Sequence, residues 1–164
     1  MEKTLEEILH GVDVLTVKGD VRVRVKDLKY DSREVDPGDV FFVVKGTRED
    51  GFRFIPDALR RGARVLVLDR ACQEVEGVTY VYVKDVRDAL ARMAMNFFQF
   101  PSRKLTLIGV TGTNGKTTVT YLLESIFKQA GLSPGVIGTV NYRWSGRTYP
   151  ARVTTPESVD LQRI

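Results

Sequence analysis

Short apolar runs alternate with amphipathic stretches along the first hundred residues. Residues 40–44, 65–68 and 78–83 are rich in apolar and β-branched side chains, the pattern of strands buried on both faces of a sheet. Residues 54–62 and 86–97 instead repeat their apolar side chains at helical spacing. Strands interleaved with helices predict a layered α/β fold.

The beginning of the chain carries signals for a short helix followed by an exposed strand. Thr4 and Glu7 have the spacing of a capping box, and Gly11 is suited to end the helix. Residues 12–25 contain alternating apolar and polar side chains, most clearly at 21–25, which predicts a half-exposed strand after a turn at Gly19 and Asp20.

A second unit is predicted after the polar, proline-bearing stretch at residues 101–104. Residues 105–110 have the pattern of a buried strand, and residues 121–130 that of a helix with its apolar side chains on one face. Residues 135–140 have the pattern of a further strand. Together they predict the first β-α-β unit of a mononucleotide-binding domain.

Composition and charge exclude several classes of protein. The 164 residues carry 25 Lys and Arg against 21 Asp and Glu, a mild excess without the basic stripe of a nucleic-acid-binding protein. The single cysteine, Cys72, and the single histidine, His10, argue against a disulfide framework and a Cys- or His-based metal centre. The acidic start and the short apolar runs predict a cytoplasmic protein without membrane insertion.

The most informative segment is residues 107–118, where a predicted strand leads through a glycine turn directly into a helix. Backbone N–H groups converge in such a turn, and the helix N-terminus adds positive potential, so the site suits a phosphate. Gly112 and Gly115 let the backbone curl around an anion. The predicted nucleotide-binding residues are Gly112, Thr113, Asn114, Gly115, Lys116, Thr117 and Thr118.

Two side chains of this segment have chemistry that suits a nucleoside triphosphate. Lys116 supplies a cation for the β- and γ-phosphates, and the hydroxyl of Thr117 is placed to bind Mg²⁺. Val110 stands where the general P-loop pattern has its first glycine, so the shorter Gly-Thr-Asn-Gly-Lys-Thr sequence carries this prediction.

The sequence TGTNGKTT at residues 111–118 resembles the ATP loop of the Mur ligases, and folylpolyglutamate synthetases have a related loop. The sequences YDSR at 30–33 and PGDVFF at 37–42 favour the Mur ligases, because they resemble the N-terminal domain of that family. The sequences GVIGT at 135–139 and TTPE at 154–157 are most similar to the members that add the third amino acid to the UDP-linked peptidoglycan precursor.

The resemblance implies an ATP- and Mg²⁺-dependent ligase of peptidoglycan synthesis. Its substrates would be UDP-N-acetylmuramoyl-L-alanyl-D-glutamate and an amino acid, joined through an acyl phosphate. Lys116 and Thr117 would be catalytic, with Thr117 also the metal ligand. By the same resemblance, the implied substrate contacts are Tyr30, Ser32, Thr47, Arg48, Glu49, Thr154 and Thr155.

Members of that family are much longer and have three domains. The resemblance therefore implies that residues 1–102 form the domain that binds the UDP substrate, and that residues 103–164 begin an incomplete ATP-binding domain. A chain of this extent is expected to be a truncated form without activity of its own. Two alternatives stay open, namely a Mur ligase that adds the terminal dipeptide and a non-catalytic module that binds a nucleotide or a UDP-sugar.

Overall fold

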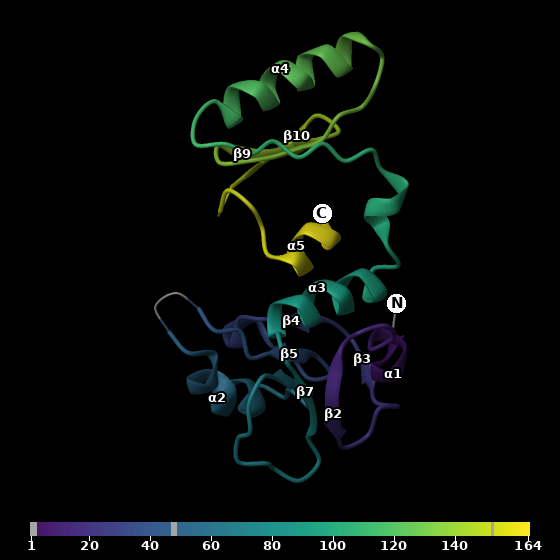
Figure 1. Ribbon diagram of the computed structural model, residues 1–164, viewed down its shortest axis with the longest axis vertical. Coiled ribbons are helices and arrows are strands. Elements are labelled where there is room, and N and C mark those ends of the chain that lie inside the picture. The colour runs from purple at the N-terminus through teal and green to yellow at the C-terminus, as the bar shows by residue number, and fades with distance from the viewer. Residues whose placement is uncertain (1–2, 47–48, 152) are drawn as a thin grey trace. The chain divides into compact units, whose positions relative to one another are not determined.

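The computed structural model describes residues 3–46, 49–151 and 153–164 (Figure 1). The chain divides into two compact units, Met1–Pro101 with Ser158–Ile164, and Ser102–Glu157. The chain thus leaves the first unit after Pro101 and returns to it at Ser158. Within the described ranges, no helix has the length and apolar character needed to cross a membrane.

A five-stranded sheet forms the centre of the first unit, with the strand order β2-β7-β6-β5-β4. Neighbours among the last four strands pair in parallel, and β2 joins the edge of β7 antiparallel. The three predicted buried strands are confirmed as β5, β6 and β7. The strands are β2 (Val14–Lys18), β4 (Leu28–Lys29), β5 (Val40–Phe42), β6 (Val65–Leu68) and β7 (Thr79–Val83).

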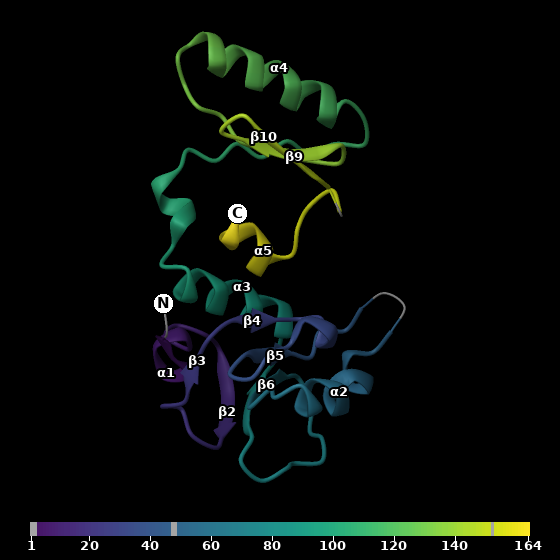
Figure 2. The ribbon, with the colours of Figure 1, turned by 180° about the vertical axis from the view of Figure 1, so that it is seen from behind.

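Helices cover both faces of this sheet, as the views from opposite sides show (Figures 1 and 2). Alternate residues of the buried strands point to opposite faces, so Val65 and Val67 join one core while Leu66 and Leu68 join the other. The first core is closed by α1 (Leu5–Ile8), α3 (Val86–Phe97) and α5 (Ser158–Arg163), and the second by α2 (Ile55–Arg60). This arrangement confirms the α/β fold.

Local signals placed the starts of α1 and α3 correctly, whereas α1 ends at Ile8, before the predicted stop at Gly11. The backbone N–H of Thr4 donates to Glu7 at 2.7 Å and that of Glu7 donates to the Thr4 hydroxyl at 3.3 Å, which is the predicted capping box of α1. The Asp85 carboxylate accepts from the backbone N–H groups of Arg87 and Asp88 at the start of α3.

The alternating stretch 12–25 forms two strands rather than one. β2 pairs with β7, whereas β3 (Arg24–Val25) pairs with β1 (Lys3–Thr4). The separation lies at Gly19, whose backbone has a φ of +122° and passes so close to Thr79 that a Cβ would lie 2.6 Å from its hydroxyl. The described residues also form three short 3₁₀ helices, η1 (Ser32–Glu34), η2 (Gly51–Phe54) and η3 (Pro101–Lys104).

The second unit contains one long helix and an antiparallel three-stranded sheet. The helix α4 (Lys116–Gln129) starts directly at the glycine turn, earlier than its apolar pattern predicts. The strands β8 (Val136–Ile137), β9 (Asn141–Trp144) and β10 (Arg147–Pro150) pair in the order β10-β9-β8. Trp144 and Tyr149 stack with ring centroids 4.5 Å apart across the β9–β10 hairpin.

The predicted β-α-β unit is wrong in two respects. Residues 105–110 form no strand, and Leu105, Leu107 and Ile108 are exposed. Of residues 135–140, β8 takes only two, and it pairs antiparallel. A strand requires a neighbour to satisfy its backbone groups, and within the described ranges no segment pairs with residues 105–110.

The apolar face predicted for the second helix is only partly covered. Leu123 and Phe127 are half-buried, whereas Leu122 and Ile126 are each 59% exposed, and Glu124 is the buried residue of α4. The unpaired stretch and this helix face thus leave apolar side chains without the sheet that a mononucleotide-binding domain provides.

Candidate functional site

The glycine turn has the backbone of an anion-binding loop. Gly112 and Gly115 have φ values of +143° and +76°, in the region that favours glycine. Gly115 is the N-cap of α4, and no side chain caps the first-turn amides. The turn is exposed along its length, so these amides can be reached by a ligand.

The Lys116 side chain folds back over this loop. Its Nζ donates to the carbonyl oxygen of Gly112 at 2.6 Å, which holds the cation beside the loop. A phosphate oxygen bound by the loop amides would compete with that carbonyl for the ammonium group. Thr113, Asn114 and Thr118, the other predicted members of the site, are exposed.

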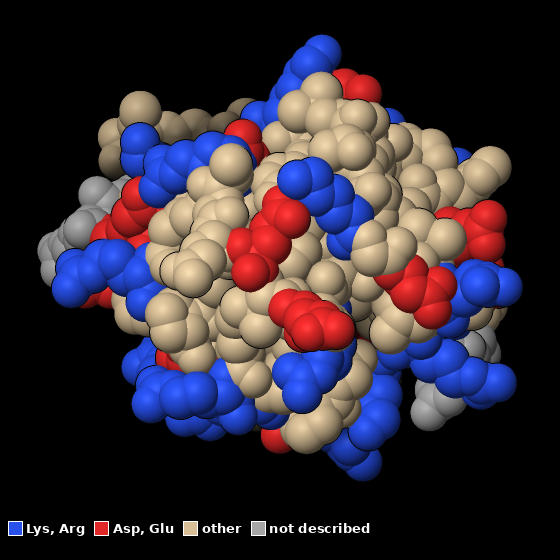
Figure 3. Space-filling model, turned by 90° about the horizontal axis from the view of Figure 1, so that it is seen from below, with Lys and Arg blue, Asp and Glu red and all other residues tan. Residues whose placement is uncertain are grey.

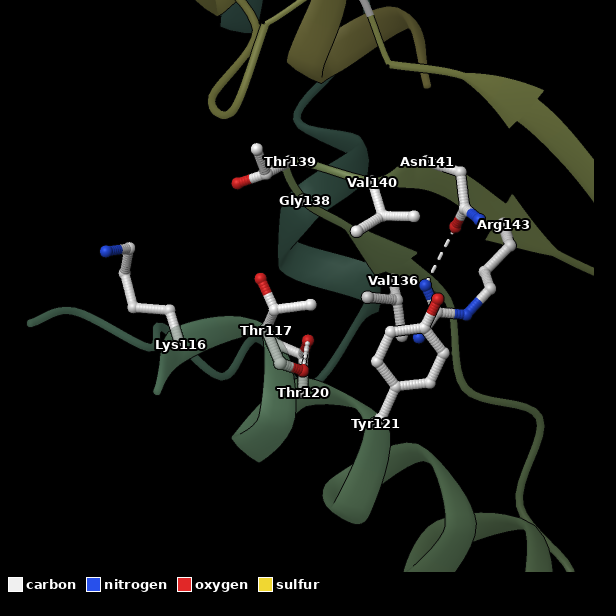
Figure 4. A pocket seen from close by; sticks show the side chains of 10 residues that line it. All are labelled: Lys116, Thr117, Thr120, Tyr121, Val136, Gly138, Thr139, Val140, Asn141 and Arg143. Carbon is white, nitrogen blue, oxygen red and sulfur yellow. Dashed lines mark hydrogen bonds between the residues drawn. The ribbon is translucent and has the colours of Figure 1, made fainter. Parts of the chain in front are cut away.

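A hollow lies next to the loop, between the start of α4 and the turn from β8 to β9 (Figure 4). The hydroxyl oxygen of Thr117 points toward Thr139 across it, while Lys116 lies at its outer side. The enclosed space is about 30 Å³, room for one or two waters, so a polyphosphate would lie over the mouth of the hollow. The lining residues are Lys116, Thr117, Thr120, Tyr121, Val136, Gly138, Thr139, Val140, Asn141 and Arg143.

The predicted substrate residue Thr154 reaches the same place. The hydroxyl oxygens of Thr139 and Thr154 are 3.2 Å apart and share a hydrogen bond. Tyr142 holds the neighbouring backbone, because its hydroxyl donates to the Val153 carbonyl at 2.6 Å. Thr139 therefore stands between Thr117 of the predicted nucleotide set and Thr154 of the predicted substrate set, while Thr155 is exposed.

The predicted substrate residues of the first unit are engaged with protein partners. Ser32 is buried, and its hydroxyl bond to the carboxyl of Asp57 is the main reason that the pKa of Asp57 lies below its ordinary value. The Tyr30 hydroxyl donates to Asp160 of α5 at 2.6 Å. Glu49 is exposed, and its carbonyl accepts from Gly46 at 3.0 Å.

Two further predicted substrate contacts, Thr47 and Arg48, lie outside the described residues.

On the face shown in Figure 3, basic and acidic side chains are interspersed, in keeping with the small net charge.

Thr117 fits magnesium as one oxygen ligand among several. Mg²⁺ keeps most of its waters and takes one or two protein oxygens together with substrate phosphates. The described residues contain no cluster of three or more His, Cys, Asp or Glu side chains that could form a complete metal cage. A metal here would therefore be held by the Thr117 hydroxyl and by the oxygens of a bound polyphosphate.

Sequence reasoning missed four residues of this region. Thr139 and Asn141 line the hollow, and Glu124 and Arg143 form a buried ion pair beneath it, with Arg143 NH2 2.6 Å from Glu124 Oε2. Thr139 lies in the segment 135–139 that carries the family resemblance, so a signal existed for it. The ion pair joins an α4 residue to a β9 residue, and no local sequence pattern predicts a contact between two different elements.

Two family models match the chain. The Mur ligase family catalytic domain matches residues 24–98, and the Mur ligase middle domain matches residues 110–164. The chain belongs to the Mur ligase family. This confirms the resemblance seen in the TGTNGKTT loop and in the segments 30–33 and 37–42.

Curated Mur ligases are similar over nearly the whole chain. The UDP-N-acetylmuramoyl-L-alanyl-D-glutamate–2,6-diaminopimelate ligase of Caldanaerobacter subterraneus subsp. tengcongensis is 43% identical over 98% of this chain and 33% of its own length. The ligase of the same name from Geobacter sulfurreducens is 43% identical over 96% of this chain and 31% of its own length. The chain thus spans about a third of the length of the relatives it matches.

Solved Mur ligase structures share the fold. A UDP-N-acetylmuramoyl-L-alanyl-D-glutamate–2,6-diaminopimelate ligase aligns with 99% of this chain and 32% of its own at a TM-score of 0.71, with 23% identity. The structure of UDP-N-acetylmuramoylalanyl-D-glutamyl-2,6-diaminopimelate–D-alanyl-D-alanyl ligase from Acinetobacter baumannii aligns with 82% of this chain and 29% of its own at 0.61, with 26% identity.

Proposed function

We propose that this chain provides substrate- and nucleotide-binding parts of an ATP-dependent Mur ligase of peptidoglycan synthesis, working in the cytoplasm where ATP is supplied. The ligase would add an amino acid to UDP-N-acetylmuramoyl-L-alanyl-D-glutamate, and the similar relatives are named for 2,6-diaminopimelate as that amino acid. Residues 1–102 would bind the UDP part, and residues 103–164 would begin the ATP-binding domain. The observation that carries the proposal is that Lys116, Thr117 and Thr139 line one hollow and that Thr139 shares a hydrogen bond with Thr154.

The chemistry requires activation of a carboxylate, which is a poor acyl donor at neutral pH. A carboxylate oxygen attacks the γ-phosphorus of ATP, ADP leaves, and an acyl phosphate forms. The amine of the amino acid then attacks the carbonyl carbon, and inorganic phosphate leaves as the amide forms and the amine loses a proton. Positioning and neutralisation of charge supply most of the catalysis in such phosphoryl transfers.

Each residue of the loop has a defined part in that reaction. The amides of Gly112 to Gly115 would hold phosphate oxygens, and Lys116 would exchange its bond to the Gly112 carbonyl for one to the β- and γ-phosphates. A bound Mg²⁺ would neutralise charge on the transferring phosphate, with Thr117 as its protein ligand. Thr154, joined to Thr139, would place the substrate carboxylate beside that phosphate.

Calorimetry of the 164-residue chain tests the proposal. We expect UDP-N-acetylmuramoyl-L-alanyl-D-glutamate to bind measurably through its UDP part and MgATP to bind more weakly, because the chain spans about a third of its relatives. UDP alone should compete with the first ligand, and CDP serves as the matched control. Tight binding of one ligand with no affinity for the other would instead support a dedicated non-catalytic module.

The ligase that adds the terminal dipeptide has weaker support. The solved D-alanyl-D-alanyl ligase is 26% identical over 82% of this chain, against 43% over 98% for the diaminopimelate ligase of Caldanaerobacter.

A further inference from the structure

Arg143 is the polar centre of the interface between α4 and its sheet. Its Nε donates to the Glu124 carboxylate at 2.7 Å and its NH1 donates to the Asn141 side-chain oxygen at 2.8 Å. The guanidinium also lies over the Tyr121 ring, 3.9 Å from the ring centroid. Lys128 adds a second cation to the same carboxylate at 2.8 Å. Tyr121, Glu124 and Asn141 thus contact the guanidinium of Arg143, and Lys128 contacts its partner Glu124.

The cluster adds a polar anchor to the partly buried apolar side chains of α4. The side chains of Arg143 and Glu124 are only 13% and 10% exposed, whereas Leu122 and Ile126 are each 59% exposed. Within the described part of the chain, every hydrogen bond and ion pair between α4 and the three strands involves Arg143. A planar guanidinium that is bonded on several sides fixes the orientation of its partners as well as their distance from it.

The cluster shares a face of α4 with the nucleotide site. Thr117, Tyr121, Glu124 and Lys128 follow one another at steps of one helical turn, so they lie along one side of the helix. A rotation of α4 about its axis at Glu124 would therefore also turn Thr117 away from Thr139. Figure 4 shows Thr117, Tyr121 and Arg143 around the same hollow.

We propose that Arg143 is a positioning residue for the phosphate loop: by joining Glu124 of α4 to Asn141 of β9, it sets the rotation of α4 that holds Thr117 opposite Thr139. This inference rests on the proposed function, because the loop that Arg143 would position is the predicted nucleotide site. Arg143 acts through other residues and touches no reacting atom. A lysine at this position would keep the charge but lose the fork that binds two partners at once.

Amide hydrogen exchange of the whole 164-residue chain tests the inference without any ligand. The first protected amides of α4 are those of Val119 and Thr120, because Val119 donates to the Gly115 carbonyl of the loop at 2.9 Å. In Arg143→Lys we expect exchange to become several-fold faster at residues 119 and 120 as well as near the substitution. Arg147→Lys on the neighbouring strand is the matched control and should leave residues 119 and 120 unchanged, because Arg147 is exposed. Unchanged exchange at 119 and 120 in Arg143→Lys would overturn the inference, since a purely local role would confine the effect to 121–128 and 141–145.

A second pair of variants keeps the test decisive if Arg143→Lys unfolds. Glu124→Gln removes the charge of the partner and should produce the same faster exchange at residues 119 and 120. The charge-swapped double variant Glu124→Arg with Arg143→Glu should recover part of the lost protection, because it rejoins α4 to β9. Exchange at residues 119 and 120 that neither variant changes counts against the positioning role.

Titration with inorganic tripolyphosphate and Mg²⁺ separates this inference from the proposed function. If the parent chain binds tripolyphosphate, Arg143→Lys should bind it several-fold more weakly, and equal affinity would contradict the positioning role. If the parent chain does not bind it, the nucleotide assignment fails, while the exchange measurement still decides whether Arg143 positions the loop.

Discussion

The hydroxyl of Tyr30 donates a hydrogen bond to the Asp160 carboxylate at 2.6 Å. This bond ties α5 to the segment after β4, and Arg163 adds a second tie to Asp27 at 2.7 Å. The binding of substrate by Tyr30 stays a prediction, but the structure gives the same hydroxyl a role in fastening α5 to the first unit.

Tyr30→Phe separates these two roles, because it keeps the ring and removes only the hydroxyl. We expect the first unit to lose about 1 kcal/mol of unfolding free energy, the usual net value of a partly exposed hydrogen bond. Urea unfolding measures this loss, and the amides of α5 should exchange faster. Tyr149→Phe is the control in the second unit. Unchanged stability combined with weaker binding of UDP would assign the hydroxyl to the substrate instead.

Thr139→Val tests the link between the two predicted site segments. Valine has the shape of threonine but cannot bond the Thr154 hydroxyl, so residues 153–155 should become more mobile and show faster amide exchange. Affinity for UDP-N-acetylmuramoyl-L-alanyl-D-glutamate, measured by calorimetry, should fall. Thr120→Val is the control. Thr120 lines the same hollow, and its replacement removes only a hydrogen bond to the Thr117 carbonyl, so this variant should bind the ligand as the parent does.

The Glu124–Arg143 pair predicts acid sensitivity of the second unit. The Arg143 hydrogen bond, followed by that of Lys128, holds the pKa of the Glu124 carboxyl below its ordinary value. A lowered folded-state pKa contributes stability that is fully present above the unfolded value, about 4.3, and is lost as the pH falls through the folded value. Trp144, the single tryptophan of the chain, lies in β9 and reports unfolding of this unit by fluorescence.

Glu124→Gln should remove this acid dependence and lower the stability of the second unit at pH 7 by about 2 kcal/mol, because it leaves a buried arginine without its counter-ion. Asp88→Asn is the control, since its pair with Arg92 is half exposed on α3 and contributes little. An unchanged acid transition of Trp144 fluorescence in Glu124→Gln would show that the pair does not stabilise the unit.

The first unit was largely predictable because its signals are local. The runs 40–44, 65–68 and 78–83 show burial on both faces, and the caps at Thr4 and Asp85 lie next to the helices they begin. The glycine turn that leads into α4 was predictable for the same reason, since glycines, lysine and helix follow one another directly.

The second unit was less predictable, because local patterns do not specify contacts between elements. The apolar run at 105–110 has the composition of a buried strand but does not specify which strand it would pair with, and the described residues contain no such partner. The pairs Glu124–Arg143 and Thr139–Thr154 join residues from different elements, so their contact follows from the packing of those elements and not from sequence spacing. The return of α5 to the first unit is fixed in the same way, by the partners of Asp160 and Arg163.

We propose that the loop from Gly112 to Thr117 binds the polyphosphate of a nucleotide, with Lys116 as its cation. Phosphorus NMR of MgATP titrated with the 164-residue chain tests it most directly, with Lys104→Ala as the control for loss of an exposed lysine. We predict that the β- and γ-phosphate resonances shift with the parent and with Lys104→Ala, and that Lys116→Ala binds on the order of tenfold more weakly while keeping its fold. Equal binding by Lys116→Ala and the parent would contradict the account.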